Sequence, residues 1–335
     1  MIEGHGDDAY HYDGIRSDFS SNICAATSHR SLMTHLAAHP ELLAHYPEPE
    51  AWSLECILAR QLGISPKCVI VTSGATEAIY LIAQTFRYKA VIPTPTFSEY
   101  EDACRCFEDK EDRTMLWLCN PNNPDGHVYS PADIGRMADE HDLVVLDQSY
   151  EHYTDHAVMS PAEAVRLPHI IQIHSFTKTY AVPGLRLGYI TAHENLSEAL
   201  RCNLHPWSVS AVAIEAGKFL AEHDELACRP DLTETQRLRQ RLMAIGIDVL
   251  PTQTNFMLCR INGSVTAADL KDYLARCHHL LIRDASNFRG LTPQHFRVAA
   301  QTPPENDDLT AAIQQFIQQS VTLRPKKHNF DNREA

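Results

Sequence analysis

Short apolar segments that alternate with helical patterns constrain the fold of this chain more than any other feature of its sequence. The segments 69–72, 114–119 and 143–146 are apolar almost throughout, and each is followed by a turn and a stretch with helical spacing. Strands without a polar face lie in sheets that helices cover on both sides. Strand–helix alternation is typical of parallel strands joined by crossover helices. The sequence therefore predicts an α/β fold with a mostly parallel, doubly covered sheet.

The remaining patterns divide the chain into two parts. Further strands are expected at 90–93, 170–174 and 187–191, and helices at 54–62, 77–86, 100–107 and 131–141. A helical tract over 211–244, broken near Pro230, follows. Then strands at 248–250, 255–258, 280–283 and 296–300 alternate with helices at 267–277 and up to about 319, as in a smaller α+β unit. A chain of 335 residues is long enough for two domains. We predict an N-terminal arm at 1–28 that joins the small domain, a large domain at 29–225, a small domain at 226–323 and a disordered tail at 324–335.

Charge and composition exclude several classes of function. The chain has 29 Lys plus Arg against 43 Asp plus Glu, a formal charge of −14, so it has no excess of cations for a nucleic acid or an anionic membrane. No apolar stretch is long enough for a membrane span, and the first 19 residues do not have the pattern of a signal peptide. We expect a cytoplasmic enzyme without nucleic-acid or membrane partners.

The cysteines and histidines do not predict a disulfide or a metal site. The ten cysteines lack a C-x-x-C pair, which indicates reduced thiols in a cytosol. His35 with His39, and His152 with His156, are spaced as i, i+4 pairs, but each pair supplies only two ligands, whereas a tetrahedral metal needs three or four. We therefore predict no metal.

A turn of small residues connects the strand at 69–72 to the following helix. In this turn, Ser73-Gly74-Ala75-Thr76-Glu77, unpaired backbone N–H groups and the helix dipole form a site where a phosphate can bind. Plain helix capping gives the same pattern, so the turn alone does not decide between the two.

Two further polar groups follow apolar strands. The turn Asn120-Pro121-Asn122-Asn123-Pro124-Asp125-Gly126 is rigid and holds amide side chains at the carboxyl edge of the sheet, where ligands bind in open α/β sheets. Asp147 ends the strand at 143–146. A carboxylate there needs a cation or a donor as partner, and a protonated ring nitrogen would serve.

The segment His174-Ser175-Phe176-Thr177-Lys178-Thr179-Tyr180, followed by Pro183-Gly184-Leu185-Arg186-Leu187-Gly188-Tyr189, is the most informative. Lys178 lies between an apolar strand and a Pro-Gly turn, which favours the end of the sheet over a solvated surface. A lysine that is partly desolvated there can form a Schiff base. Ser175, Thr177 and Arg186 offer donors for a dianionic phosphate.

These four motifs, in this order and spacing, resemble the fold-type-I pyridoxal-phosphate aminotransferases of the histidinol-phosphate aminotransferase group, over roughly residues 18–319. Other stretches are most similar to the L-threonine-O-3-phosphate decarboxylases of cobalamin biosynthesis: 5–7, 18–23, 95–101, 206–209 and 282–291. The resemblance implies the aspartate aminotransferase-like fold, with a mostly parallel seven-stranded sheet in the large domain. It also implies pyridoxal 5'-phosphate as the cofactor.

The resemblance implies a role for each matching residue. Lys178 would hold the cofactor as a Schiff base and move protons, and Asp147 would keep the pyridine nitrogen protonated. Asn123 and Tyr150 would hold the ring hydroxyl, and Phe97 would stack on the ring. The cofactor phosphate would be bound by residues of three segments: Gly74, Ala75, Thr76, Ser175, Thr177 and Arg186. Tyr46 would reach the phosphate of the neighbouring subunit in a homodimer with shared active sites.

The substrate is expected to be a small phosphorylated amino compound. Its anionic groups would meet Arg283 and Arg297, with Asn22, Asn255 and His5 nearby. Each arginine could equally form a surface ion pair if the sequence is taken alone. Four departures from the family pattern are Asp7, Cys24-Ala25, Asp125 and Gln148. None removes a cofactor residue, and the first two lie in the segment that closes over the substrate in this family.

The loop 287–291, which makes the spacing between Arg283 and Arg297 longer than in histidinol-phosphate aminotransferases, favours a decarboxylase acting on L-threonine O-3-phosphate. The alternatives are a histidinol-phosphate aminotransferase, a broad-specificity amino-acid aminotransferase and a non-catalytic protein of the same fold. The presence of Lys178 and Asp147 disfavours the last of these.

Overall fold

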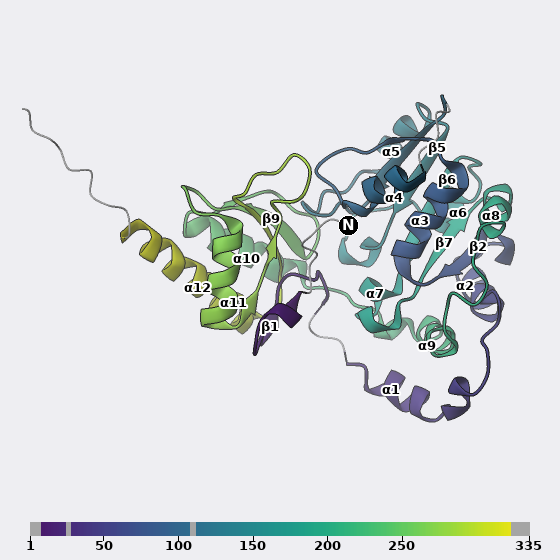
Figure 1. Ribbon diagram of the computed structural model, residues 1–335, viewed down its shortest axis with the longest axis horizontal. Helices are drawn as coiled ribbons and strands as arrows, with labels where there is room; N and C mark the ends of the chain where they lie inside the picture. Colours follow the sequence, from purple (N-terminus) through teal and green to yellow (C-terminus); the bar gives the residue numbers. More distant parts are fainter. Residues whose placement is uncertain (1–7, 25–27, 108–111, 323–335) are drawn as a thin grey trace, which may run out of the picture.

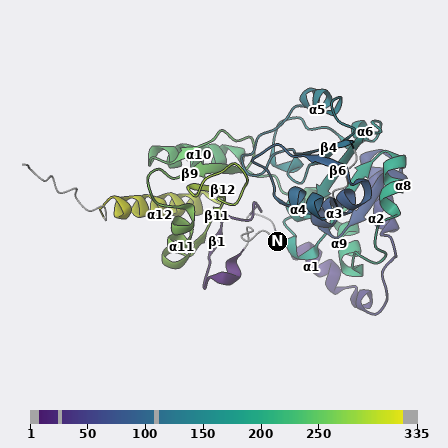
Figure 2. The ribbon, with the colours of Figure 1, turned by 45° about the horizontal axis from the view of Figure 1, so that its top comes forward.

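The computed structural model describes residues 8–24, 28–107 and 112–322. Figures 1 and 2 show two lobes side by side, a larger one around a sheet that contains β2, β4, β6 and β7 and a smaller one around β9 and β12. The strands of the large sheet are β2 (Val69–Thr72), β3 (Lys89–Val91), β4 (Thr114–Cys119), β5 (Leu143–Asp147), β6 (Ile170–Ser175) and β7 (Gly188–Ala192). Its helices are α1 (Arg30–Ala37), α2 (Trp52–Leu62), α3 (Gly74–Phe86), α4 (Glu99–Phe107), α5 (Pro131–Ala138), α6 (Pro161–Ala164), α7 (Phe176–Thr179), α8 (Glu194–Arg201) and α9 (Ala211–Ala221).

The smaller lobe is built mainly from the C-terminal third of the chain. Its strands are β1 (Ser17–Asp18), β8 (Asp248–Val249), β9 (Phe256–Arg260), β10 (Leu280–Leu281), β11 (Arg283–Asp284) and β12 (His295–Ala299). Its helices are α10 (Leu232–Ala244), α11 (Ala267–His278) and α12 (Pro303–Thr322). β1 pairs in parallel with β10, so the chain near the N-terminus contributes to this lobe. The exact domain bounds at residues 28, 225 and 323 stay a prediction.

The large sheet has the strand order β2-β7-β6-β5-β4-β3. The pairs β3·β4, β4·β5 and β5·β6 are parallel, whereas β7 runs antiparallel to both β2 and β6. The α/β class and the mostly parallel sheet are therefore confirmed, but six strands replace the expected seven in the described part of the chain.

Successive side chains along each strand point to opposite faces of this sheet, and helices cover both faces. Met115, Trp117, Val145 and Ile171 pack with α3 and α4 on one face. Their sequence neighbours Leu116, Leu118, Val144 and Leu146 pack with α5 and α6 on the other, where α2 and α9 cover β2 and the start of β7. Two buried faces on each strand require the near-continuous apolar runs that the sequence contains.

The predicted break near Pro230 is confirmed, since the tract at 211–244 is two helices, α9 and α10, and proline lacks the N–H that a continuous helix needs. Other elements differ from the predicted ones. The strand expected at 280–283 is divided at Ile282, so that β10 pairs with β1 and β11 pairs with β12. Sequence patterns also missed α1, α6, α7, α8 and β1, all eight residues or shorter, since short elements carry little periodicity. No helix of the described residues is long and apolar enough to cross a membrane, and no disulfide joins the described cysteines.

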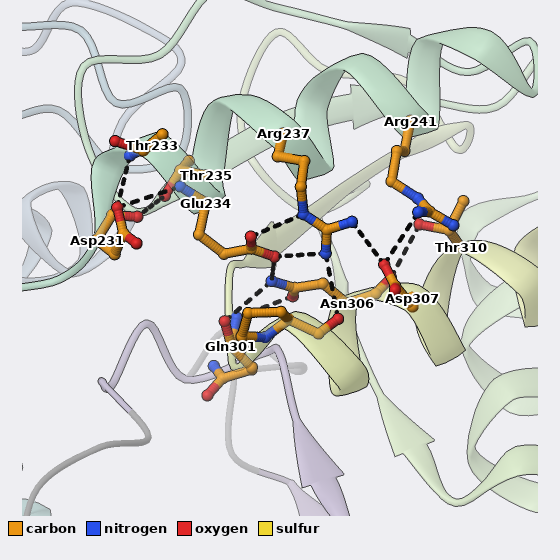
Figure 3. A network of polar contacts seen from close by, with 11 residues as sticks. Asp231, Thr233, Glu234, Thr235, Arg237, Arg241, Gln301, Asn306, Asp307 and Thr310 are labelled. Carbon is orange, nitrogen blue, oxygen red and sulfur yellow. Dashed lines mark hydrogen bonds and ion pairs between the residues drawn. The ribbon is translucent and has the colours of Figure 1, made fainter.

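A buried polar network connects α10 to α12 in the small lobe (Figure 3). The Asn306 amide, which is fully buried, donates to Glu234 Oε1 at 2.7 Å and to Gln301 O at 2.9 Å, and its oxygen accepts from Gln301 N at 2.9 Å. Arg237 donates to both oxygens of Glu234 at 2.7 and 2.8 Å. The Gln301 side chain in turn reaches Ile23 O at 3.4 Å, so the network also supports the N-terminal segment beside the cavity described below.

Replacing Asn306 with alanine is expected to lower the free energy of unfolding by about 2 to 4 kcal/mol. Glu234 Oε1 keeps only its bond from Arg237, while the backbone N–H and oxygen of Gln301 lose their bonds to Asn306. Equilibrium unfolding in denaturant measures this. Asp308→Ala is the matched control on the same helix, since the ion pair of Asp308 with Arg16 is half exposed and such pairs contribute less than about 1 kcal/mol. Equal losses of stability in the two variants would contradict the role assigned to the network.

Candidate active site

A cavity of about 370 Å³ lies where the strands of the large sheet end. The register aligns Cys119 with Asp147 and Asp147 with Ile173, while Ser175 and Thr72 both pair with Gly188. The residues that follow these positions therefore meet at one edge of the sheet. The cavity has its second wall in the small lobe, where Arg283, Phe288 and Arg297 line it, and its third wall in the N-terminal segment, at Ser20, Ser21 and Ile23.

Asp147 is 4% exposed at the end of β5 and faces the cavity. The Tyr100 hydroxyl donates to Asp147 Oδ2 at 2.7 Å, and the Ser149 backbone N–H donates to Oδ1 at 2.9 Å. Burial, and next the charge of Asp147, raise the pKa of Tyr100 well above its ordinary value, so this hydroxyl keeps its proton and acts as a donor. The two bonds fix the carboxylate and leave it able to pair with a cationic N–H in the cavity.

Lys178 is in α7, the one-turn helix directly after β6. Its Nζ donates to the backbone oxygen of Ser21 at 2.7 Å and lies 5.8 Å from the centre of the Tyr150 ring. The Tyr153 hydroxyl donates to Lys178 O at 2.8 Å and anchors the short helix. The amine thus points into the cavity from the sheet side, close to the N-terminal segment that closes it.

The start of α3 forms a cradle with Arg186 and with Gly188, the first residue of β7. A Cβ added to Gly74, which has a φ of +81°, would lie 2.7 Å from an Arg186 terminal nitrogen. A Cβ added to Gly188 would lie 2.9 Å from Ala75 N. Only glycine permits these approaches, which bring the guanidinium and the N–H groups of the first helical turn together. Ser175 and Thr177 are buried and also line the cavity. Five groups can therefore donate to one anion: the backbone N–H groups of Ala75 and Thr76, the two hydroxyls and the Arg186 guanidinium.

Tyr150 and Asn123 border the middle of the cavity. Burial raises the pKa of Tyr150 to about 12 against an opposing effect of Arg297, so the phenol is neutral at neutral pH and can donate a hydrogen bond. The Asn22 amide donates to the Tyr150 hydroxyl oxygen at 3.4 Å. Arg297 donates to the side-chain oxygen of Asn123 and to the backbone oxygen of Ser20, which ties the small lobe to the sheet edge.

Arg283 and Arg297 face each other directly across the antiparallel pair β11·β12 and are 6% and 4% exposed. Arg283 donates to Asn287 Oδ1 at 2.9 Å. Neither guanidinium forms an ion pair with a carboxylate within residues 8–24, 28–107 and 112–322. Burial, and next the charge of Arg297, lower the pKa of Arg283 to about 10, and burial also lowers the pKa of Arg297. Both remain charged at neutral pH, and two such charges side by side form a site for anions.

The structure brings most of the predicted site residues to this one cavity. Twelve of them line it: Ala75, Thr76, Phe97, Asn123, Asp147, Tyr150, Ser175, Thr177, Lys178, Arg186, Arg283 and Arg297. Gly74 lies behind Arg186, and Asn22 and Asn255 are buried outside the lining with amide atoms that lack a partner. Tyr46 is 88% exposed and is not part of the cavity lining, and its role at a neighbouring subunit stays a prediction. His5 lies outside the described residues.

Two of the four departures from the family pattern have a structural explanation. Asp125 Oδ1 accepts from the Asn122 amide at 2.8 Å and from His127 N at 3.1 Å, which closes the turn. Gln148 points away from the cavity and donates to Met159 O at 3.1 Å. Cys24 packs against the large-lobe core, and Asp7 and Ala25 lie outside the described residues.

Sequence patterns missed several residues that line the cavity: Ser20, Ser21, Ile23, Ser98, Tyr100, Cys119, Ser149, Pro183 and Phe288. Ser149 could have been inferred, because it follows Asp147 by two residues. Tyr100 could not, because it begins an amphipathic helix, where an aromatic residue usually indicates core packing. Its contact with Asp147 joins positions 47 residues apart.

Tyr100→Phe is expected to weaken binding of pyridoxal phosphate by about 10- to 100-fold, because a hydrogen bond to a charged group contributes about 1.5 to 3 kcal/mol. Titrating the cofactor-free protein and following the visible absorbance of the bound cofactor measures this affinity. Tyr80→Phe is the control, since its hydroxyl meets Glu99 at 3.3 Å outside the cavity. An affinity of Tyr100→Phe equal to that of this control would rule out the positioning role of Tyr100.

The chemistry of the cavity matches pyridoxal 5'-phosphate. The cradle of Ala75, Thr76 and Arg186 suits a dianionic phosphate, since a helix N-terminus and a guanidinium meet there. Asp147 suits a protonated ring nitrogen and Lys178 suits an aldehyde. The orphaned amide atoms of Asn22 and Asn255 add unused donors and acceptors behind the cavity wall.

Comparisons with known proteins place this chain among enzymes of the same chemistry. Residues 106–313 match the family model described as aminotransferase class I and II. The chain is 28% identical to a threonine-phosphate decarboxylase of Salmonella typhimurium, over 90% of this chain and 91% of that protein. It is 27% identical to a histidinol-phosphate aminotransferase of a Thermoanaerobacter species, over 81% of this chain and 84% of that protein.

A crystal structure of similar architecture is that of the L-threonine-O-3-phosphate decarboxylase from Porphyromonas gingivalis. It superposes with a TM-score of 0.84 at 35% sequence identity and covers 90% of this chain and 99% of that one.

Proposed function

Because this chain belongs to the class I and II aminotransferase family and uses pyridoxal 5'-phosphate as its cofactor, we propose that it decarboxylates L-threonine O-3-phosphate to (R)-1-amino-2-propanol phosphate. The pair of buried arginines across β11·β12 carries this proposal. Like charges that lie directly opposite in a sheet destabilise it unless an anion lies between or above them. A substrate with a carboxylate and a phosphate supplies two anionic groups at once.

The similarity to decarboxylases supports the same reaction. Two of the proteins named above decarboxylate threonine phosphate by their descriptions, and one of them is 35% identical to this chain. The loop that we associate with this substrate, residues 287–291, contributes to the cavity through Phe288, and the Arg283 guanidinium lies 5.6 Å from the centre of that ring. Asn287 accepts from Arg283 and orients it. The loop thus helps to build the anion site.

Each protein group has a specific task in this proposal. When bound, pyridoxal phosphate supplies an electron-poor ring that accepts the electron pair released at Cα. Asp147 holds a proton on the ring nitrogen, and Tyr150 and Asn123 hold the ring oxygen. Arg283 and Arg297 bind the anionic groups of the substrate and so decide which bond to Cα is presented for cleavage. The bond from Cα to the carboxylate breaks and carbon dioxide leaves. Lys178 Nζ then donates a proton to Cα in its place, so the reaction needs no second substrate.

We further propose a homodimer with shared active sites in the cytoplasm, working in cobalamin biosynthesis. Tyr46 and Trp207 are exposed, and so are the large apolar side chains of Met33, Leu43 and Trp52. Exposed apolar side chains that lie together are typical of a protein interface. The Tyr46 ring lies 5.9 Å from the Trp207 ring, so both would be covered together. Sedimentation of the holoenzyme tests the dimer, and Tyr46→Phe tests whether the hydroxyl contributes to cofactor affinity.

The reaction is tested by incubating the holoenzyme with L-threonine O-3-phosphate and assaying carbon dioxide and aminopropanol phosphate. Histidinol phosphate with 2-oxoglutarate is run in parallel. Release of carbon dioxide with the first substrate alone is the expected result. Formation of glutamate from the second mixture without carbon dioxide from the first would make the protein an aminotransferase and refute the proposal.

A further inference from the structure

A group of metal-ligating side chains lies outside the active site, between α1 and α9. His35 is in the last turn of α1, His39 follows that helix, and Glu215 is on α9. One ligand atom from each of these three half-buried residues lies within 4.8 Å of the other two. We propose that these three side chains bind a Zn²⁺ ion that fixes α1 and the segment after it to α9. This inference does not depend on the proposed function.

The sequence of α1 explains why the histidines face α9. One face of α1 and of the segment after it is less exposed than the rest. It carries Leu32, which is buried, and the half-buried His35, Leu36 and His39 at helical spacing. His35 stacks on Phe219 of α9 with ring centres 4.5 Å apart, and its Nε2 lies 2.9 Å from Glu215 Oε1. Glu215 and Phe219 are themselves four residues apart on α9 and therefore share a face. Both helices thus present their ligands to the same space.

The donor set suits zinc. Two imidazole nitrogens and a carboxylate oxygen form one of the common three-ligand sets of protein zinc sites, with a fourth position that water can fill. Glu41, whose Oε1 lies 3.0 Å from His39 Nδ1, adds a second negative charge at the edge of the site.

The geometry requires only small side-chain movements. Ligand atoms of a tetrahedral zinc lie about 3.4 Å apart, given metal–ligand distances of about 2.1 Å. His39 is 38% exposed and can adjust toward the other two ligands. Zinc at this position would replace the hydrogen bond between His35 Nε2 and Glu215 Oε1, and the ring proton of a neutral His35 would then lie on Nδ1. Lys218 pairs with Oε2 of Glu215 at 2.6 Å and leaves Oε1 to the ion.

The test compares zinc binding by the holoenzyme and its variants, using competition with a chromophoric chelator after removal of bound metal. His39→Gln and Glu215→Gln each remove a ligand, and His39 is exposed enough that its replacement should not affect folding. His223→Gln is the matched control, because the His223 ring also stacks on Phe219, with ring centres 4.1 Å apart, but lies outside the ligand set. Exposed thiols such as Cys106 and Cys202 are present in every variant, so any zinc they bind cancels in the comparison.

The wild type and His223→Gln are expected to bind one more equivalent of zinc per chain than the two ligand variants, or to bind it at least about 100-fold more tightly. Zinc should also slow amide hydrogen exchange across α1 in the wild type and not in His39→Gln. Equal zinc binding by the wild type and His39→Gln, or an equal reduction in His223→Gln, would overturn the proposal and leave His35 and Glu215 as a plain hydrogen-bonded pair.

Discussion

Replacing Lys178 with alanine is expected to abolish measurable turnover, with a loss of about 10⁴-fold or more, while the protein keeps its fold. Positioned proton transfer by a side chain contributes about 10² to 10⁴-fold, and this residue would in addition hold the cofactor covalently. The substitution removes the Nζ atom together with its hydrogen bond to Ser21 O, whereas the backbone oxygen of residue 178 keeps its bond from Tyr153. The measurement is carbon dioxide release under saturating substrate, together with the visible spectrum of the bound cofactor.

The control for this substitution is Lys67→Ala, which removes a lysine from the short segment between α2 and β2, away from the cavity. It should retain wild-type activity and spectrum. The thermal midpoint of Lys178→Ala in the presence of cofactor should show that the protein is folded. Turnover by a folded Lys178→Ala within about tenfold of the wild type would eliminate Lys178 as the catalytic base and covalent anchor.

Arg297→Ala is expected to raise the Michaelis constant for the phosphorylated substrate by roughly 30- to 4,000-fold. This range corresponds to about 2 to 5 kcal/mol for the loss of one partner of a buried charge-assisted pair. Arg297 is 4% exposed beside Arg283, so the substrate anion would lose half of its guanidinium partners. Steady-state kinetics with L-threonine O-3-phosphate measure this change.

Arg297 also donates to Asn123 and Ser20, so a second variant must separate binding from structure. Arg297→Lys keeps the positive charge but loses the planar guanidinium that can donate two hydrogen bonds to one anion. Its Michaelis constant should therefore fall between those of the wild type and the alanine variant. Arg260→Ala on the neighbouring strand β9 is the control, because that side chain is exposed. An unchanged Michaelis constant in a folded Arg297→Ala would remove Arg297 from the substrate site.

The elements that carry the site were predictable because they are local in sequence. The turn that begins α3, Asp147 at the end of β5 and Lys178 after β6 each follow an apolar strand, and parallel strands bring their carboxyl ends to one edge. The six strands of the large sheet were therefore all placed within a few residues. The seventh strand has no counterpart among the residues that the structure describes, and it came from the family pattern and not from any apolar segment of this chain.

Contacts between distant segments were not predictable from local patterns. Both arginines were candidates, but no sequence pattern indicated that the division of the strand at 280–283 places Arg283 directly opposite Arg297. Tyr100 and Ser21 contact Asp147 and Lys178 across 47 and 157 residues. Such pairs depend on the packing of α4 and of the N-terminal segment against the sheet edge.

The α/β architecture, the anion-binding turn and the lysine and aspartate at the strand ends follow from local patterns, since hydrophobic periodicity and turn chemistry act over a few residues. Which charges lie together depends instead on how distant segments pack. His35 and His39 offered two ligands, and Glu215 becomes the third only because α9 packs against α1. Arg283 and Arg297 form an anion site for the same reason. The packing of the whole chain brings the two guanidinium groups together and buries them, and charge repulsion and desolvation both depend on that placement.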